Sequence, residues 1–238
     1  MIKKISSPIL ITIDIDWAPD FVIDFVAEKL LFAEIPATWF VTHNSPAIER
    51  LRQQNNFFEL GIHPNFMNNS SHGETVNDVL SYCLQLVPNA RFVRSHGLVQ
   101  SSNILDSFMD IESLYIDCSL FIPGCADIFC FKYKRKGKIL CRIPYYWEDD
   151  YSMESEQNII DYKLWDVEEL ISKGEGIKIF NFHPVHIYLN SSDMVNYNKL
   201  KDRYPNLLDA KEKNIFDLIN NGYGTMNFFE QLIDAMCD

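Results

Sequence analysis

The sequence lacks any apolar stretch that approaches the roughly 18 residues of a membrane-spanning helix. It also lacks internal repeats, low-complexity tracts and a linker rich in Pro, Gly or Ser. Lys3 and Lys4 precede a short apolar run, as in a signal peptide, but Asp14 interrupts the run and no small-residue cleavage site follows. We therefore expect residues 1–238 to form one domain without a transmembrane segment or a secretory leader.

Basic residues are scarce, because 21 Lys and Arg stand against 33 Asp and Glu and give a formal net charge of −12. This balance argues against binding to a nucleic acid polymer. The one basic cluster, Lys132–Lys138, lies between two β-rich segments and is interpreted as a hairpin tip. The tip is either a solvated turn or a site for the phosphate of an activated sugar or lipid head group.

The six cysteines contain no Cys-x-x-Cys pair. This spacing favours buried, reduced thiols over a disulfide framework or a cysteine-based zinc site. Reduced thiols are typical of the cytoplasm, which is the location that we expect.

What the sequence does have is a regular alternation of β-rich apolar runs and helical patterns. The β-rich runs begin at Ile9 and continue with residues 37–42, 57–62, 91–94, 114–120, 139–146 and 177–182. Helical patterns lie between them, including an Asp166-x-x-Glu169 capping box, and the C-terminal third is helical with a core-facing stripe from Phe228 to Met236. This alternation predicts βαβ units and a parallel sheet or barrel.

Two carboxylates, Asp14 and Asp16, end the first β-rich run. A single Asp in this place is typical of a helix cap or a turn. Side chains two residues apart on a strand point to the same side, so both acids are expected on one face. Two like charges beside a buried strand need a positive partner, and the pair therefore indicates a metal site or a catalytic site.

Only six histidines are present, and four of them follow predicted strands: His43, His63, His96 and His183. In a (β/α) barrel the carboxyl ends of the strands converge on one face, where reactive groups gather. Each histidine alone fits a capping or core role. Together with the two acids they predict a divalent metal site of two histidines and one carboxylate.

Five motifs, in order, resemble those of the polysaccharide deacetylase superfamily, also called NodB-like or carbohydrate esterase family 4. They are residues 12–16, 37–40, 59–63, 94–96 and 180–183. Segments 62–66, 94–96 and 147–150 resemble the WbmS-like branch of O-antigen and surface-polysaccharide deacetylases. The resemblance implies an α/β fold, a distorted (β/α) barrel of roughly seven strands. It also implies metal-dependent removal of an N-acetyl group from a sugar, with an O-acetyl group as the alternative.

Two positions depart from the family pattern. Met67 stands four residues after His63, where the family usually has its second metal histidine. We infer that His96 replaces it, with His72 in the polar loop 68–73 as the alternative. Asn181 stands where the family has Leu, which we expect to affect packing only.

The resemblance assigns a role to each candidate. Asp16, His63 and His96 hold the metal, which is Zn²⁺, with Co²⁺, Ni²⁺ or Fe²⁺ as alternatives. Asp14 is the general base, His183 protonates the departing amine, and Arg94 keeps Asp14 ionised. Asn65 and Trp147 are candidates for a supporting role or for contact with the substrate. Asp149 or Asp150 is expected to orient Arg94 or His183, with a solvated acidic turn as the alternative.

Other functions stay open at this point. Relatives of this superfamily hydrolyse other C–N bonds, such as cyclic amides, and a catalytically silent carbohydrate-binding barrel would keep the same fold. A purely structural barrel leaves the acidic pair unexplained. The expected partner is an acetylated sugar, either free or linked to a nucleotide or lipid; the sequence fixes neither the sugar nor the oligomeric state.

Overall fold

A computed structural model describes residues 8–154 and 165–237 of the chain. Its strands are β1 (Ile9–Asp14), β2 (Ala37–Val41), β3 (Phe58–Ile62), β4 (Phe92–Val93), β5 (Ile116–Asp117), β6 (Phe131–Arg135), β7 (Lys138–Arg142), β8 (Trp147–Glu148) and β9 (Lys178–Phe182). Its α-helices are α1 (Asp20–Phe32), α2 (Pro46–Gln53), α3 (Val76–Leu86), α4 (Ser102–Asp110), α5 (Asp149–Glu154), α6 (Val167–Ser172), α7 (Pro184–Leu189), α8 (Val195–Arg203) and α9 (Thr225–Cys237). Short 3₁₀ helices are η1 (His96–Leu98), η2 (Leu207–Asp209), η3 (Glu212–Asn214) and η4 (Phe216–Leu218).

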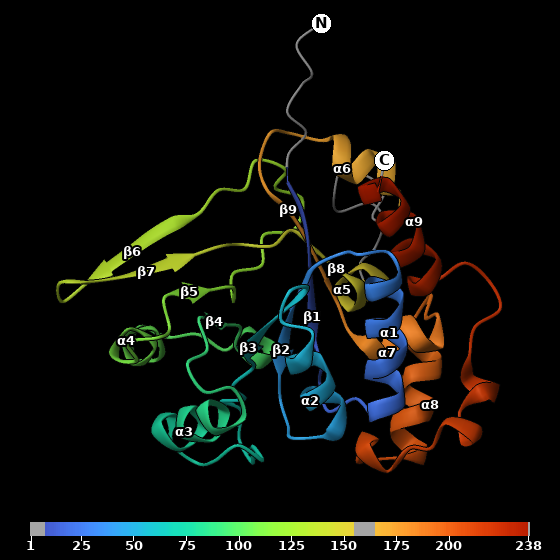
Figure 1. Ribbon diagram of the computed structural model, residues 1–238, viewed down its shortest axis with the longest axis horizontal. Coiled ribbons are helices and arrows are strands. Elements are labelled where there is room, and N and C mark those ends of the chain that lie inside the picture. The colour runs from blue at the N-terminus through green and yellow to red at the C-terminus, as the bar shows by residue number, and fades with distance from the viewer. Residues whose placement is uncertain (1–7, 155–164, 238) are drawn as a thin grey trace, which may run out of the picture.

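All the strands belong to one sheet with the order β6-β7-β5-β4-β3-β2-β1-β9-β8. The described pairings are parallel except that between β6 and β7, which form a hairpin projecting from the body of the molecule (Figure 1). The sheet curls and stays open, with β6 and β8 at its edges. This is the distorted α/β barrel that the resemblance implied, with nine strands among the described residues in place of the expected roughly seven.

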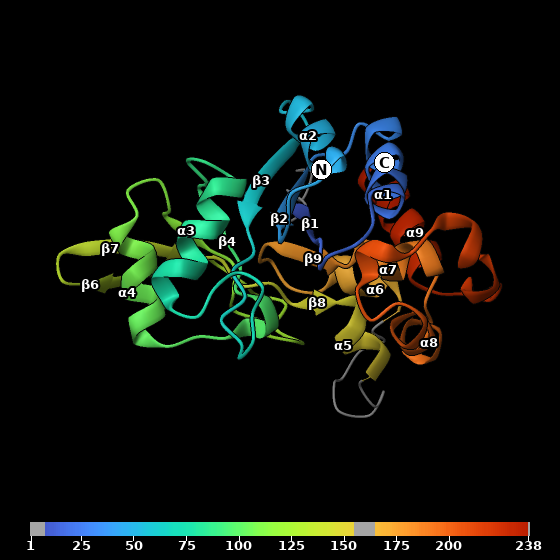
Figure 2. The ribbon, with the colours of Figure 1, turned by 90° about the horizontal axis from the view of Figure 1, so that it is seen from below.

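The middle of the sheet is buried, as its apolar runs predicted. On β1, the side chains of Ile11 and Ile13 are at most 2% exposed. Helices α1, α7 and α9 pack on one another at the β1–β9 part of the sheet, while α3 and α4 lie beside the β4–β7 part (Figure 2). The stripe predicted in the last helix faces this core: Phe228, Phe229, Leu232 and Ile233 are buried.

Side-chain caps begin four of the described α-helices: α2, α3, α4 and α6. Ser45 accepts a hydrogen bond from the Ile48 N–H ahead of α2, with Pro46 as the first helical residue. Thr75 and Asp78 form a reciprocal capping box at α3. Asp166 caps α6 by accepting from the Glu169 N–H, as the sequence predicted.

Two of the predicted strands are shorter in the structure than in the prediction. The segment 114–120 contains only the short strand β5. The segment 139–146 belongs to β7 only as far as Arg142, and β8 begins beyond the segment at Trp147. β7 pairs with β5 and β6, whereas β8 pairs with β9 near the other edge of the sheet. An apolar pattern in the sequence does not reveal which part of the sheet a segment joins, because that depends on tertiary pairing.

The basic hairpin tip contacts helix α4. Arg135 and Lys136 form ion pairs with Asp106, and Lys138 forms one with Asp110. These cations are therefore partly neutralised, and a phosphate site at the tip stays a prediction.

The cysteines are all free thiols, but they are not all buried. Cys83 and Cys118 are buried as expected, whereas Cys130 and Cys237 are exposed. The exposed pair lies at the hairpin and in the last helical turn, where no core covers them. Among the described residues, no helix is long and apolar enough to span a membrane.

Candidate metal centre and catalytic site

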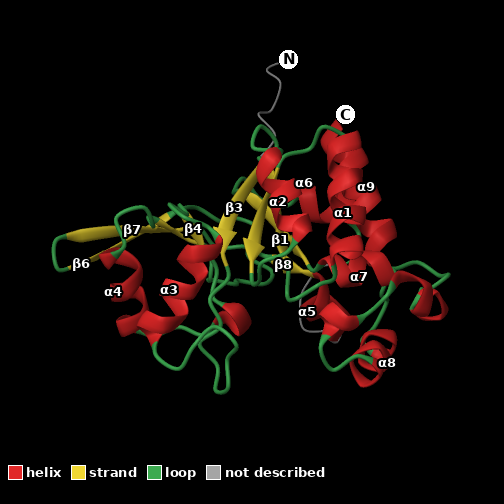
Figure 3. Ribbon diagram, turned by 60° about the horizontal axis from the view of Figure 1, so that its bottom comes forward, coloured by secondary structure: helices red, strands yellow, loops and turns green. Residues whose placement is uncertain are grey.

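Strands β1, β2, β3 and β9 run parallel and side by side, so their carboxyl ends share one edge of the sheet (Figure 3). The two acids at the end of β1 reach this edge through different backbone conformations. Asp14 is the last residue of β1 and is 3% exposed. Asp16 and Trp17 lie in a tight turn with φ of 44° and 54°, a left-handed conformation that costs a non-glycine residue about 1–3 kcal/mol. The Trp17 N–H donates to Thr42 Oγ1 at 3.1 Å and holds this turn. The expectation that strand alternation places both acids is therefore wrong; the turn places Asp16.

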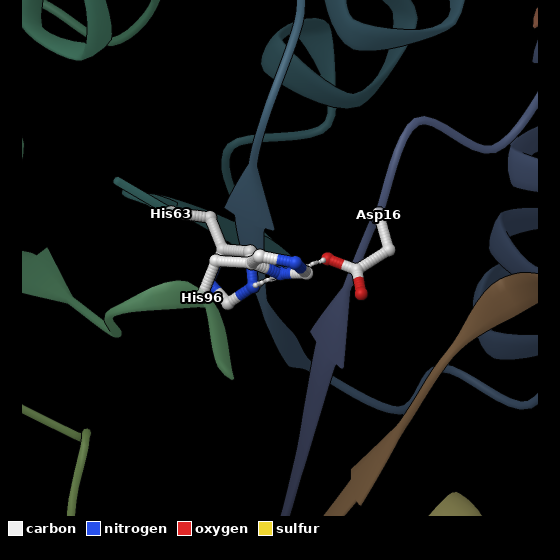
Figure 4. A group of neighbouring side chains, drawn as sticks. All are labelled: Asp16, His63 and His96. Atoms are coloured by element: carbon white, nitrogen blue, oxygen red, sulfur yellow. Dashed lines mark hydrogen bonds and ion pairs between the residues drawn. The ribbon is translucent and has the colours of Figure 1, made fainter. Parts of the chain in front are cut away.

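Three side chains from separate loops converge at this edge (Figure 4). His63 follows β3 and His96 begins η1. His63 Nε2 lies 3.1 Å from Asp16 Oδ1, and His96 Nδ1 lies 3.2 Å from the same oxygen. The two ring nitrogens are 3.3 Å apart. The structure thus brings together the three residues that the sequence assigned to the metal.

The chemistry of these atoms fits a divalent cation. His63 Nδ1 lies 2.7 Å from the Arg94 carbonyl oxygen, which only accepts, so Nδ1 carries the proton and Nε2 presents its lone pair to the centre. Ligands about 2.0–2.1 Å from a tetrahedral zinc ion are about 3.3–3.4 Å apart, close to the observed spacing. The side chains of Asp16 and His96 are 21% and 23% exposed, which leaves one side of the centre accessible.

The same contacts shift the pKa values of Asp16 and His96. Burial raises the pKa of Asp16, but the contacts of its carboxylate with the His63 and His96 imidazoles hold it well below its usual range. Burial lowers the pKa of His96, but the adjoining Asp16 carboxylate raises it above its usual value overall. Both shifts show that Asp16 keeps its negative charge, which a metal ligand requires.

His72 is engaged elsewhere. Its Nε2 lies 2.8 Å from the Thr42 carbonyl oxygen, and its Nδ1 accepts from the Asn65 N–H at 3.1 Å. Burial lowers the pKa of His72 to about 4. Met67, at the position where the family has its second histidine, lies beside Gly97 and therefore next to the loop that carries His96.

A buried arginine holds the first acid. Arg94 is inaccessible to solvent, and its Nη1 donates to Asp14 Oδ1 at 3.0 Å. Its guanidinium lies between the rings of Phe40 and Tyr145, 4.5 and 4.2 Å from their centroids. Burial raises the pKa of Asp14, but the charges of Arg94, His63 and His183 together bring it below its usual value, and Arg94 contributes the largest share of this lowering. Asp14 therefore stays ionised although it is buried.

A second acid–imidazole pair lies on the other side. Asp149, at the start of α5, accepts from the His183 backbone N–H at 2.8 Å and contacts His183 Nδ1 at 2.7 Å. His183 Nε2 lies 3.6 Å from Asp16 Oδ2. Burial lowers the pKa of His183, but Asp149 and Asp150 raise it well above its usual value. The imidazole thus keeps its proton and directs Nε2 toward the centre.

Three predicted residues lie away from this cluster. Trp147 is 1% exposed and stacks on Phe228 at 4.3 Å, so it packs in the core and cannot lie against a sugar. Asn65 supports His72 and, through Oδ1, accepts from the Met67 N–H. His43 is buried and contacts Thr42 Oγ1.

Two polar residues at the site were missed or misjudged. Asn181, expected to affect packing only, donates to Asp14 Oδ2 and to Glu148 Oε1, both at 2.9 Å. Glu148 was not assigned any role, yet it lies among Asp14 and His183 with ligand atoms within 4.8 Å of one another. The sequence contains one sign of this role, because Thr12 and Asn181 are polar residues within otherwise apolar runs. In the structure Thr12 Oγ1 donates to Asn181 Oδ1 at 2.9 Å.

Residues 11–201 match the family of WbmS-like polysaccharide deacetylases. This match covers well over half of the chain. The chain belongs to this family. The cluster of acids, histidines and Arg94 described above lies within the matched range of this WbmS-like polysaccharide deacetylase.

Solved structures agree with this assignment. WbmS from Bordetella bronchiseptica, described as a polysaccharide deacetylase involved in O-antigen biosynthesis, is 32% identical; the superposition has a TM-score of 0.78 and covers 95% of this chain and 90% of that chain. No curated protein matches the chain.

Two further structures show weaker likeness. A carbohydrate esterase family 4 pseudoenzyme from Bacillus anthracis is 15% identical, with a TM-score of 0.46 over 86% of this chain and 66% of that chain. The carbohydrate esterase family 4 domain of a multidomain xylanase from the hindgut metagenome of Trinervitermes trinervoides is 14% identical, with a TM-score of 0.43 over 95% and 91%. At this similarity neither structure informs the function of this family member.

Proposed function

We propose that this chain is a metal-dependent hydrolase that removes an N-acetyl group from a sugar used in a surface polysaccharide. One observation carries the proposal: Asp16, His63 and His96 meet within 3.1–3.3 Å, flanked by an arginine-held Asp14 and an aspartate-held His183. The similarity to WbmS, which is described as acting in O-antigen biosynthesis, supports the choice of substrate class.

Asp14 is the general base. Its Oδ1 is held by Arg94, whereas its Oδ2 lies 4.0 Å from His63 Nε2 and faces the triad. Because the Arg94 charge keeps Asp14 ionised, Oδ2 takes the proton of the attacking water molecule.

His183 is the general acid. Asp149 fixes the ring through Nδ1 and favours the protonated form, so Nε2 donates a proton to the departing amine nitrogen. Base and acid both lie beside the triad: Asp14 Oδ2 is 4.0 Å from His63 Nε2, and His183 Nε2 is 3.6 Å from Asp16 Oδ2. Asp14 takes one proton from the attacking water molecule and His183 gives one to the departing amine nitrogen, so the two transfers balance.

Asp16, His63 and His96 would hold the divalent ion. When bound, such an ion polarises the acetyl carbonyl and lowers the pKa of a water molecule. Two imidazole nitrogens and one carboxylate suit Zn²⁺, with Co²⁺, Ni²⁺ and Fe²⁺ as alternatives. The substrate is an acetylated sugar, free or linked to a nucleotide or lipid, and the reaction takes place in the cytoplasm.

Acetate release from N-acetylated sugars by the zinc-loaded protein tests this proposal. Asp14→Asn should keep its zinc and lose about 10²–10⁴-fold in kcat, the usual contribution of a general base. Zinc content is measured on the same samples by elemental analysis. An Asp14→Asn variant with undiminished kcat would contradict the assignment of the base.

The wild-type assay also separates the alternatives. Ring opening of cyclic amides without acetate release would favour hydrolysis of another C–N bond. Sugar binding with neither reaction would favour a silent carbohydrate-binding domain.

A further inference from the structure

The amide of Asn181 uses its full hydrogen-bonding capacity inside the fold. Its side chain is inaccessible to solvent. The Nδ2 group donates to Asp14 and to Glu148, each at 2.9 Å. The Oδ1 atom accepts from Thr12 Oγ1 at 2.9 Å and from Arg94 Nη1. A primary amide offers two donors and two acceptor positions, and here all four are occupied.

This pattern allows only one orientation of the amide. A flip by 180° would place Oδ1 against the Asp14 and Glu148 carboxyl groups and Nδ2 against the Arg94 guanidinium, which cannot accept. Asn181 therefore presents an N–H to Asp14 Oδ2 in a fixed direction. Arg94 holds the other oxygen, so the two carboxylate oxygens of Asp14 have separate partners.

Sheet register explains how these groups meet. Thr12 on β1 is the register partner of Asn181 on β9, and Asn181 is the register partner of Glu148 on β8. The three side chains thus form one row across adjacent parallel strands. Asp14 lies two residues beyond Thr12, on the same face of β1.

Glu148 is fixed at the end of this row. Its Oε1 accepts from Asn181 Nδ2 at 2.9 Å and from the Tyr145 hydroxyl at 3.1 Å. Tyr145 is itself buried, with its ring against the Arg94 guanidinium. The second N–H of Asn181 therefore has a buried acceptor. Without that acceptor this N–H would be buried and unpaired, which favours a shift of the amide out of its present position beside Asp14.

We propose that Asn181 and Glu148 are a positioning pair that orients Asp14 Oδ2 for its part in the reaction. The inference rests on the proposed function, in which Asp14 is the base. Neither residue needs to touch the substrate. Asn181 acts on Asp14 directly, and Glu148 acts through Asn181.

Two substitutions at Glu148 test whether the role of this residue depends on its acceptor oxygen or only on the volume of its side chain. Glu148→Gln keeps an oxygen in the place of Oε1, so it should retain kcat within about 3-fold. Glu148→Leu removes that acceptor, and kcat should fall by about 10²-fold because a misplaced catalytic group costs this much. Zinc content and KM should stay unchanged in both, since neither substitution touches Asp16, His63 or His96.

Glu148→Ala serves as a second variant if Glu148→Leu does not fold, and it should lose kcat to a similar extent. A kcat that Glu148→Leu and Glu148→Ala leave unchanged would overturn the inference. So would an equal loss in Glu148→Gln, because that would point to the charge and not to the acceptor.

Crystal structures of the zinc-loaded wild type, Glu148→Leu and Glu148→Gln provide a readout that needs no activity. We expect a single Asp14 orientation in the wild type and in Glu148→Gln, and a rotated or multiply oriented Asp14 in Glu148→Leu. An unchanged Asp14 in Glu148→Leu would overturn the positioning role even in an active enzyme. A wild type that releases no acetate, with Asp14 rotated in Glu148→Leu, would instead refute the proposed function and leave the positioning role supported.

Discussion

A single residue, Arg94, sets the state of two groups at the site. Its carbonyl oxygen accepts from His63 Nδ1 and so directs the lone pair of Nε2 toward Asp16. Its guanidinium donates to Asp14 Oδ1 and keeps that carboxylate ionised. One buried residue after β4 therefore orients both a proposed metal ligand, His63, and the proposed base, Asp14.

At this scale the choice of third metal ligand is open to a direct test. His96→Ala removes a nitrogen that lies 3.2 Å from Asp16 Oδ1. Zinc affinity should fall by more than the roughly 10–100-fold typical of changes outside the ligand shell. His72→Ala should keep its zinc, because both ring nitrogens of His72 are engaged by Thr42 and Asn65. Metal stoichiometry after dialysis measures both outcomes.

His43→Ala is the matched control for this pair. His43 is a buried histidine at the end of a neighbouring strand, and it contacts Thr42 rather than the triad. It should keep its zinc as His72→Ala does. Loss of zinc in His72→Ala, with zinc retained in His96→Ala, would reverse the ligand assignment.

At the scale of an element, the two-residue strand β8 and the start of α5 divide neighbouring side chains between core and site. Trp147 enters the core, Glu148 faces Asn181, and Asp149 holds His183. Alternation along the strand separates the first two, and the turn into α5 places the third. Three consecutive residues thus serve both purposes: the first packs in the core, and the other two contact residues of the candidate site.

Trp147→Ala should therefore destabilise the protein and have little direct effect on substrate binding. Loss of a buried aromatic side chain costs about 3–5 kcal/mol, and Trp147 packs against Phe180, Phe182 and Phe228. Urea denaturation of the variant measures this loss in the free energy of unfolding. Trp147→Phe, which keeps a ring, should lose less. A raised KM with unchanged stability would instead show that Trp147 contacts the sugar.

At the scale of the whole molecule, the parallel sheet gathers groups that are far apart in the sequence. Asp16, His63 and His96 follow different strands and meet at one edge. Because the three ligands belong to separate parts of the sheet, a bound ion would link those parts to one another.

Removal of the metal should therefore lower the melting temperature of the whole chain. A ligand at 100 times its Kd stabilises the folded state by about 2.7 kcal/mol. Thermal unfolding with excess zinc and with a chelator measures the difference. His96→Ala is the control and should respond weakly to zinc. Equal melting temperatures of the wild type under both conditions would show that the triad holds no ion.

Much of the fold and the site was predictable because the signals are local. Apolar runs predicted the strands at the centre of the sheet, and histidines or acids after those runs predicted the shared edge. The limits of β5, β7 and β8 were not predictable, because they depend on which neighbouring strands each segment pairs with in the sheet. Trp147 was assigned to the sugar for a similar reason: an aromatic residue looks the same in the sequence whether it packs in the core or lines a site.

The sequence by itself determined the α/β class, the carboxyl-edge location of Asp14, His63, His96 and His183, and the family. Tertiary structure alone decided that a left-handed turn carries Asp16, that His72 binds Thr42 and not the triad, and that Thr12, Asn181 and Glu148 form one row. The physical reason is that residue type and periodicity are local properties, whereas a hydrogen-bond partner depends on the register between strands distant in the chain.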